Sequence, residues 1–133
     1  MKFLLDTDVL SLVAREANAA LTGKVRSSSP DDLAMSVVSR GEVEFGLLFN
    51  RPKRLTEQRM RGLLASLQTL PLSAEVALHY AHIRTELNRA GIPIGINDMW
   101  IAAHARALGL VLVSNNTREF NRVPGLVVEN WLR

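Results

Sequence analysis

The sequence predicts an α/β domain with a central, mainly parallel sheet of about four or five strands and helices on both faces. Short apolar runs, which suit strands buried on both faces, alternate with longer segments in which apolar residues recur at helical spacing. The 133 residues are enough for one domain with its own core, and no repeat, low-complexity tract or long linker divides them. We therefore expect a single domain spanning residues 1–133.

The strands are predicted from short apolar runs that polar or turn-forming residues bound on both sides. The predicted strands are Lys2–Leu5, Leu33–Val38, a short strand within QTLPLS (68–73), Leu110–Val113 and Leu126–Leu132.

The helices are predicted from apolar periodicity and from residues that begin or end helices. Asp8 is expected to cap the first helix, and Ser39 the third, with Glu42 three residues later as in a capping box. Asn97 is expected to cap a strongly apolar helix that Gly109 ends. The predicted helices cover Val9–Ala14, Ala17–Arg26, the segment from Ser39 to Pro52, Arg54–Leu67, Ala74–Ala90, Asp98–Gly109 and a short stretch at Asn116–Phe120, with loops at Ser27–Asp32 and Gly91–Asn97.

The composition excludes several classes of protein. There is no cysteine, so disulfides and thiolate metal sites are excluded, and the chain suits a reducing compartment. No apolar run approaches the roughly 18–20 residues that a membrane-spanning helix needs. The N-terminus lacks the basic region, apolar core and cleavage site of a secretory signal. We expect a cytoplasmic protein that does not bind a membrane.

Positive charge is concentrated in one segment. The net charge is only +3, but RPKRLTEQRMR (51–61) contains one acidic residue and five basic ones, Arg51, Lys53, Arg54, Arg59 and Arg61. Such a segment is usually a solvated surface, and it is also suited to contact the phosphates of a nucleic acid.

Four acidic residues lie just past a predicted strand or in the first turn of a predicted helix: Asp6, Glu42, Asp98 and Glu119. Taken singly, each has an ordinary explanation, because the helix dipole favours a carboxylate near a helix N-terminus by ~0.3–1 kcal/mol. For Glu42 as a capping-box acid, and for Asp98 behind Asn97, the structural and functional explanations stay open at this point.

Asp98 is the least easily explained by local structure. The helix that follows it is apolar nearly all round (MWIAA), so its first turn is expected to be buried, yet residues 91–105 contain no Lys or Arg. A buried carboxylate without a cation is costly, and several converging carboxylates repel one another unless a metal neutralises them. Oxygen ligands without cysteine select Mg²⁺ or Mn²⁺, so the pattern indicates metal-assisted phosphodiester chemistry.

Three segments resemble a known family: FLLDTDVL (3–10), SVVSRGEVEFG (36–46) and INDMWIAAHARALGLVLVSNNTREFNRVPGLVVENWL (96–132). In order, spacing and flanking residues they look like the PIN-domain ribonucleases, specifically the VapC toxins of toxin–antitoxin pairs. Asp6 matches the first family aspartate, and Asp98 the third acid. Glu42 matches the glutamate of the middle pattern, which Ser36 and Gly46 complete.

The fourth acidic position departs from many PIN domains. Asn116 stands where an aspartate commonly lies, and Glu119 follows just after it. Whether Glu119 or Asn116 serves in that position stays open, as does the choice between one and two metal ions.

The resemblance implies a PIN-like fold and a Mg²⁺- or Mn²⁺-dependent endoribonuclease. Asp6 and Asp98 would hold the metal, with Glu42 and Glu119 in support, directly or through water. Asp8, Ser114 and Asn116 would surround these ligands. The metal would activate a water for attack on the phosphodiester and stabilise the leaving 3′-oxygen.

The resemblance also implies partners and a substrate. The substrate would be a structured RNA, often a tRNA in this family, whose cleavage inhibits translation. A VapB-like antitoxin would bind the protein, and a homodimer would form on the helices of Arg54–Ala90.

Three alternatives share part of this pattern. The DTD of residues 6–8 imitates a haloacid dehalogenase phosphatase motif, but Leu10 stands where that motif wants Thr or Val. The other two are a PIN nuclease of RNA maturation without an antitoxin and a catalytically inactive PIN-fold binding module. We expect His79, His82 and His104 to have no chemical role.

Overall fold

Five short strands form one sheet in the order β3-β2-β1-β4-β5, and every neighbouring pair is parallel. The computed structural model describes all 133 residues. The strands are β1 (Phe3–Leu5), β2 (Leu33–Ser36), β3 (Gln68–Leu70), β4 (Val111–Val113) and β5 (Val128–Glu129). The α/β architecture predicted from the sequence, with a mainly parallel sheet, is confirmed.

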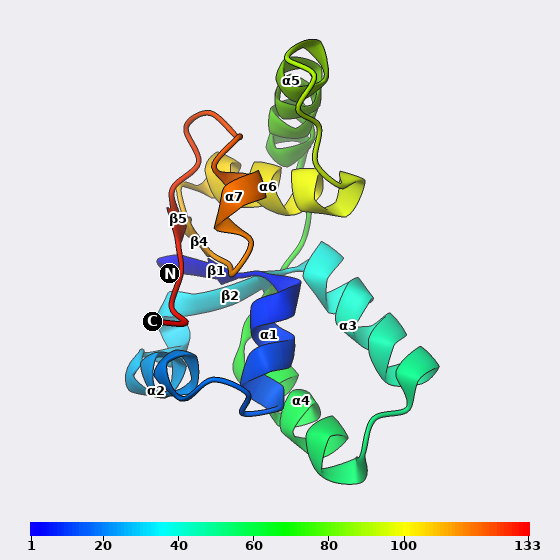
Figure 1. The fold of residues 1–133 in the computed structure, drawn as a ribbon, viewed down its shortest axis with the longest axis vertical. Coiled ribbons are helices and arrows are strands. Elements are labelled where there is room, and N and C mark those ends of the chain that lie inside the picture. The colour runs from blue at the N-terminus through cyan, green and yellow to red at the C-terminus, as the bar shows by residue number, and fades with distance from the viewer.

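Helices cover both faces of this sheet (Figure 1). In that view α1 to α4 lie below it, while α5, α6 and α7 lie above it. The helices are α1 (Thr7–Ala14), α2 (Ala19–Ser27), α3 (Val37–Asn50), α4 (Arg54–Ser66), α5 (Ala74–Arg89), α6 (Ile96–Leu108) and α7 (Thr117–Phe120), with one 3-10 turn at Pro30–Asp32. None of the helices is long and apolar enough to cross a membrane.

The sheet separates two hydrophobic cores. Successive side chains of a strand point to opposite faces, so Leu4 packs into the core beneath α5 and α6, while Leu5 packs into the core with α1, α2 and α4. Phe120 anchors the short helix α7 to the first core, and Trp131 brings the C-terminal residues onto the second. Both faces of the sheet are therefore buried, as its continuous apolar strands require.

The order in which the strands are added to the sheet reverses at β1. The chain runs from β1 outward to β2 and β3, and later returns to place β4 and β5 on the other side of β1. The amide of Asp6 donates to the carbonyl of Val113 over 2.9 Å, so the ends of β1 and β4 lie side by side. In an open parallel sheet, ligands bind at such a point, outside the carboxyl ends of the strands.

The start of α3 differs from the predicted boundary. Strand β2 ends at Ser36 rather than Val38, and Ser36 rather than Ser39 caps the helix by accepting from the Val38 amide over 3.1 Å. The β-branched pair Val37 and Val38 extended the predicted strand, because a short apolar run does not distinguish a strand from a buried helix turn. Glu42 therefore lies well inside the helix and is not a capping-box residue.

Three further boundaries are corrected. Asp6, not Asp8, caps α1, because its side chain accepts from the Thr7 amide. Helix α6 begins at Ile96 behind Gly95, so Asn97 lies in its first turn rather than at its cap. The last strand covers only Val128–Glu129 instead of Leu126–Leu132.

Candidate active site

Asp6 lies at the end of β1 and is almost completely buried, with 3% of its surface exposed. One carboxylate oxygen accepts from the Thr7 amide over 2.8 Å, and the other accepts from the Ser114 hydroxyl over 2.9 Å. Burial raises the pKa of Asp6 to about 7, although both hydrogen bonds act against this rise. The charges of Asp98 and Asp8 raise the pKa further.

Ser114 belongs to the support of this carboxylate. It is fully buried at the end of β4. Its hydroxyl donates to Asp6 and its hydroxyl oxygen accepts from the Asn116 amide over 2.9 Å. The loop after β4 is thus tied to the end of β1 through one serine.

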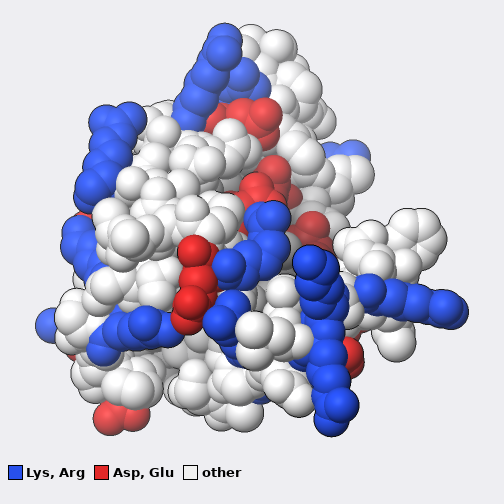
Figure 2. All heavy atoms as spheres, turned by 60° about the horizontal axis from the view of Figure 1, so that its bottom comes forward, with Lys and Arg blue, Asp and Glu red and all other residues white.

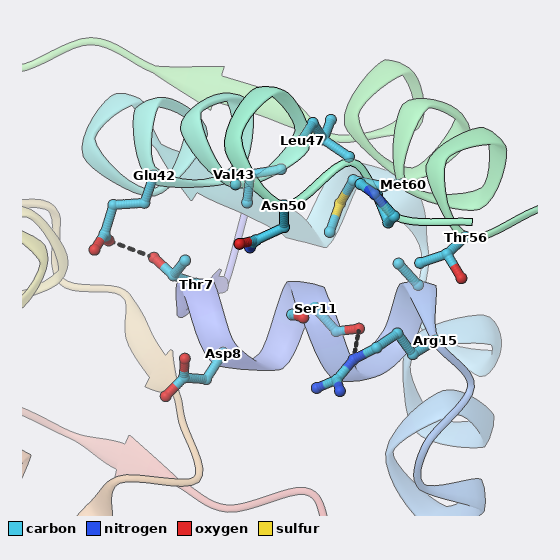
Figure 3. Close-up of a pocket in the computed structure, with 13 residues that line it drawn as sticks. Thr7, Asp8, Ser11, Arg15, Glu42, Val43, Leu47, Asn50, Thr56 and Met60 are labelled. Carbon is cyan, nitrogen blue, oxygen red and sulfur yellow. Dashed lines mark hydrogen bonds between the residues drawn. The ribbon is translucent and has the colours of Figure 1, made fainter. Parts of the chain in front are cut away.

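Glu42 approaches the same edge of the sheet from α3. Its Oε1 accepts from the Thr7 hydroxyl over 2.7 Å, and its Oε2 accepts from the Asn97 side-chain amide over 3.5 Å. Figure 3 shows Glu42 and Thr7 pointing toward each other from α3 and α1. Glu42 is consequently held by side chains of two other helices.

Asp98 lies half-buried in the first turn of α6. Burial is the largest cause that raises its pKa to about 6, and the negative charges of Glu42, Glu119 and Asp8 add to it. Acidic residues from three other elements therefore raise the pKa of Asp98, as expected where several carboxylates lie near one another.

Glu119 reaches this site from α7. Its Oε2 accepts from the side-chain amide of Asn116 over 3.1 Å, and its charge contributes to the raised pKa of Asp98. Asn116 thus contacts Glu119 as a neutral hydrogen-bond donor. Asp8 is exposed in the first turn of α1 and adds negative charge near the site.

No basic side chain neutralises these carboxylates. The ion pairs of the structure all involve other acidic residues, namely Glu16, Asp32 and Glu44. In this arrangement of side chains, no group of three or more His, Asp or Glu residues is placed so that it could hold a metal ion. Their chemistry fits a hard divalent cation, because the available ligand atoms are carboxylate and hydroxyl oxygens. The ionised carboxylates have no basic side chain that balances their charge.

A groove runs from the acidic site between α1, α3 and α4, with a volume of about 440 Å³. Thr7 and Glu42 line one end, and Met60 of α4 lines the other (Figure 3). Asn50 at the end of α3 also lines it. Glu42 also lines a second hollow, together with Asn97 and Asp98.

The basic segment divides into paired and unpaired residues. Arg61 pairs with Glu44 at 2.6 Å, and Arg59 lies 3.6 Å from a carboxylate oxygen of Glu16. The three residues around the α3–α4 turn make no ion pair and are exposed: Arg51, Lys53 and Arg54. Figure 2 shows Lys and Arg side chains bordering acidic ones on the face that contains this turn.

The sequence did not predict the residues that orient Glu42. Thr7 carried no predicted role, and Asn97 was assigned to a helix cap instead of to Glu42. His104 does more than pack in the core. Its Nδ1 lies 2.8 Å from the Ser36 hydroxyl oxygen, and both groups are fully buried. Burial lowers the pKa of His104, and the hydrogen bond between its ring and the Ser36 hydroxyl joins α6 to the start of α3.

The fold and these residues define an α/β protein with a cluster of carboxylates at the carboxyl edge of a doubly wound parallel sheet. A model of the PIN domain matches residues 3–126. Ribonuclease VapC2 of Rickettsia felis is 30% identical over 132 residues, covering 98% of each chain. The tRNA(fMet)-specific endonuclease VapC of Shigella flexneri is 34% identical over 131 residues, again covering 98% of each.

A solved structure agrees at the level of the fold. The toxin–antitoxin complex VapBC2 of Rickettsia felis, bound to a DNA fragment from its promoter, contains a chain that superposes with a TM-score of 0.86. That chain is 29% identical and the match covers 98% of this chain and 99% of the other. The protein belongs to the PIN-domain family, in its VapC ribonuclease branch.

Proposed function

We propose that the protein is a Mg²⁺-dependent endoribonuclease and the toxin of a VapBC-type pair, and that residues 1–133 act as one PIN domain. The observation that carries the nuclease part is the pair Asp6 and Asp98. Both are carboxylates with raised pKa at the carboxyl edge of the sheet, and neither has a basic partner. The VapC relatives, named ribonucleases and endonucleases, support the same reaction.

Each site residue has a distinct part in this proposal. Asp6 and Asp98 are the metal ligands, and Glu42 and Glu119 support them, directly or through a water. Mg²⁺ held by Asp6 and Asp98 would supply an activated water for attack on the phosphodiester and would stabilise the charge of the leaving 3′-oxygen. Ser114 keeps the Asp6 carboxylate oriented by donating to it, and Asn116 does the same for Glu119.

The substrate that we propose is a structured RNA, with tRNA as the first candidate, so that cleavage inhibits translation in the cytoplasm. The Shigella flexneri relative is named for cleavage of tRNA(fMet). Arg51, Lys53 and Arg54 are free to contact phosphates, because no carboxylate of the protein engages them. Arg59 and Arg61 are held by Glu16 and Glu44 and would contribute less.

The partner that we propose is a VapB-like antitoxin whose tail crosses the groove between α1, α3 and α4. A relative of this chain crystallised in a VapBC complex supports such a partner. An Arg side chain from the tail, inserted between Asp6 and Asp98, would pair with both carboxylates in place of the metal. We also propose a homodimer through the helices of residues 54–90, where Leu72 and Leu78 are exposed.

The nuclease part is tested by incubating the purified protein with total tRNA and Mg²⁺ and mapping the new ends. Asp98→Asn removes a ligand and is expected to abolish cleavage. Asp31→Asn is the matched control, because Asp31 is an exposed acid of the 3-10 turn that makes no ion pair. Equal cleavage by the Asp98 variant and the wild type would contradict the assignment.

The toxin part needs a separate experiment. Expression of the chain alone is expected to stop growth, and co-expression with the product of an adjacent small gene is expected to restore it. A protein that is harmless alone and forms no complex with that product would refute the toxin part and leave the nuclease part standing.

A further inference from the structure

Thr7 is the residue that links the first two carboxylates of the site. It stands at the first position of α1, directly after Asp6. Its backbone amide donates to Asp6 over 2.8 Å, and its hydroxyl donates to Glu42 over 2.7 Å. Asp6 and Glu42 are distant in sequence and come from the end of β1 and from α3, and no other residue hydrogen-bonds to both carboxylates.

This link is stiff. The amide of Thr7 is fixed by the backbone of the helix, and a β-branched side chain has few accessible χ1 rotamers in a helix. Thr7 therefore holds Glu42 at one distance from Asp6.

Asn97 holds the other oxygen of Glu42 more weakly. Its amide nitrogen lies 3.5 Å from Oε2, at the outer limit of a hydrogen bond, and the residue is exposed. Asn97 precedes Asp98 in the first turn of α6, so this contact also connects Glu42 with the Asp98 turn. The short Thr7 contact is the dominant one, because hydrogen bonds to charged groups weaken as they lengthen.

We propose that Thr7 is a positioning residue for the reaction, which holds the Glu42 carboxylate in place relative to Asp6, with Asn97 as a weaker second contact. Both oxygens of Glu42 already accept from these donors, so Glu42 acts as a fixed acceptor for a water rather than as a mobile ligand. This inference rests on the proposed nuclease function.

The decisive variant is Thr7→Val, which keeps the β-branch and the backbone amide and removes only the hydroxyl. We expect kcat for RNA cleavage to fall about 10- to 100-fold with little change in KM, since a hydrogen bond to a charged group is worth that much. Mn²⁺ affinity of the protein, measured by calorimetry without RNA, is expected to weaken about 10-fold. Thr7→Ser restores the hydroxyl and is expected to recover most of both losses.

Two comparisons separate positioning from general destabilisation. Thr69→Val is the matched control, because it also removes a threonine hydroxyl that bonds across elements, in this case to Arg40 over 3.2 Å, away from the acidic site. It is expected to leave kcat and Mn²⁺ affinity at the wild-type values. In a Glu42→Gln background, Thr7→Val is expected to cause less than about a threefold further loss, because the partner that it positions has already lost its charge.

The possible outcomes separate the positioning role from the nuclease function. If the wild type cleaves RNA and Thr7→Val retains its kcat and Mn²⁺ affinity, the positioning role is wrong and the nuclease function stands. Losses that Thr7→Ser does not recover, or losses that add fully to those of Glu42→Gln, also overturn it. A wild-type protein that neither cleaves RNA nor binds Mn²⁺ overturns the proposed function and this inference together.

Discussion

At the scale of single residues, Asp6 combines an observed role with a proposed one. Its side chain caps α1, and in the function that we propose it also binds the metal, for which it must be ionised in a buried position. Burial raises its pKa to about 7, so the metal-free protein holds this carboxylate ionised at a cost. A site that binds a cation is expected to contain such unfavourably buried carboxylates while the cation is absent.

Asp6→Asn is expected to stabilise the metal-free protein at pH 8. The folded pKa of about 7 lies above the ordinary value of 3.8, so the wild type loses stability as the pH rises from about 4 toward 7. The amide of asparagine escapes this loss and can still cap α1, which makes the gain a few kcal/mol at most. The melting temperatures of the two proteins should differ at pH 8 and converge near pH 4.

Metal supplies the control for this prediction. Mn²⁺ stabilises only a protein that binds it, so adding it should raise the wild-type melting temperature and leave that of Asp6→Asn unchanged. A variant that melts below the wild type at pH 8 without metal would show that the charge of Asp6 is not destabilising.

At the scale of elements, the start of α3 decides where Glu42 lies. The Ser36 hydroxyl accepts from the Val38 amide and is also hydrogen-bonded to the buried ring of His104, which connects α3 with α6. These are the two helices that carry Glu42 and Asp98. A local cap and a contact distant in sequence thus agree on one helix boundary.

Ser36→Ala is expected to lower the free energy of unfolding by about 2–4 kcal/mol. The loss combines a helix cap, typically ~1 kcal/mol, with a buried His104 nitrogen left without a partner, about 1–3 kcal/mol. Ser73→Ala is the matched control, because Ser73 is exposed and caps α5 only through the Val76 amide at 3.3 Å. Denaturant titrations that give both variants equal losses would contradict a structural role for the Ser36–His104 contact.

The turn between α3 and α4 is the second element with a testable charge. Replacing Arg51, Lys53 and Arg54 by glutamine is expected to weaken RNA binding at low salt. The slope of log affinity against log salt should fall by about 0.7–0.9 for each phosphate that the protein no longer neutralises. Binding is measured on the Asp98→Asn variant, which is expected not to cleave. Replacing Arg59 and Arg61, which are already paired, should change the slope less.

At the scale of the whole molecule, the sheet brings together what the sequence keeps apart. Asp6 follows β1, while Asp98 and Glu119 lie in α6 and α7, yet β1 and β4 are neighbours and α6 and α7 pack on one face (Figure 1). The charges of Glu42 and Glu119 reach Asp98 because a reversal in strand order opens the carboxyl edge of the sheet at this point. The site is therefore a property of the topology.

The helices of residues 54–90 leave apolar side chains exposed, among them Leu78 of α5 with 58% of its surface accessible. If the surface around Leu78 forms the homodimer, Leu78→Glu should convert the protein to a monomer in sedimentation experiments, because a buried unpaired charge opposes association. Leu108→Glu, at an exposed leucine of α6 outside residues 54–90, is the control and should remain dimeric. A Leu78 variant of unchanged mass would exclude this surface.

Local patterns determined the order and type of the elements. Apolar runs predicted the strands, helical periodicity predicted the long helices, and Gly109 ends α6 as predicted, in a left-handed conformation at φ 66°. Asp6 and Asp98 were also found from the sequence, because a carboxylate at a strand end or a helix start is visible within a few residues, whereas Glu42 lies well inside α3 and was matched through the family pattern. Their assignment as ligands stays a prediction.

Only the tertiary structure decided how those residues are held. The partners of Glu42 are Thr7 and Asn97, the partner of Ser36 is His104, and each lies on another element of the chain. Sequence reasoning placed the cap of α3 at Ser39 because both serines have the same local propensity, and the buried ring that favours Ser36 is distant in sequence. Propensity acts over one helical turn, whereas hydrogen bonds in a core act between segments that only the folded sheet makes neighbours.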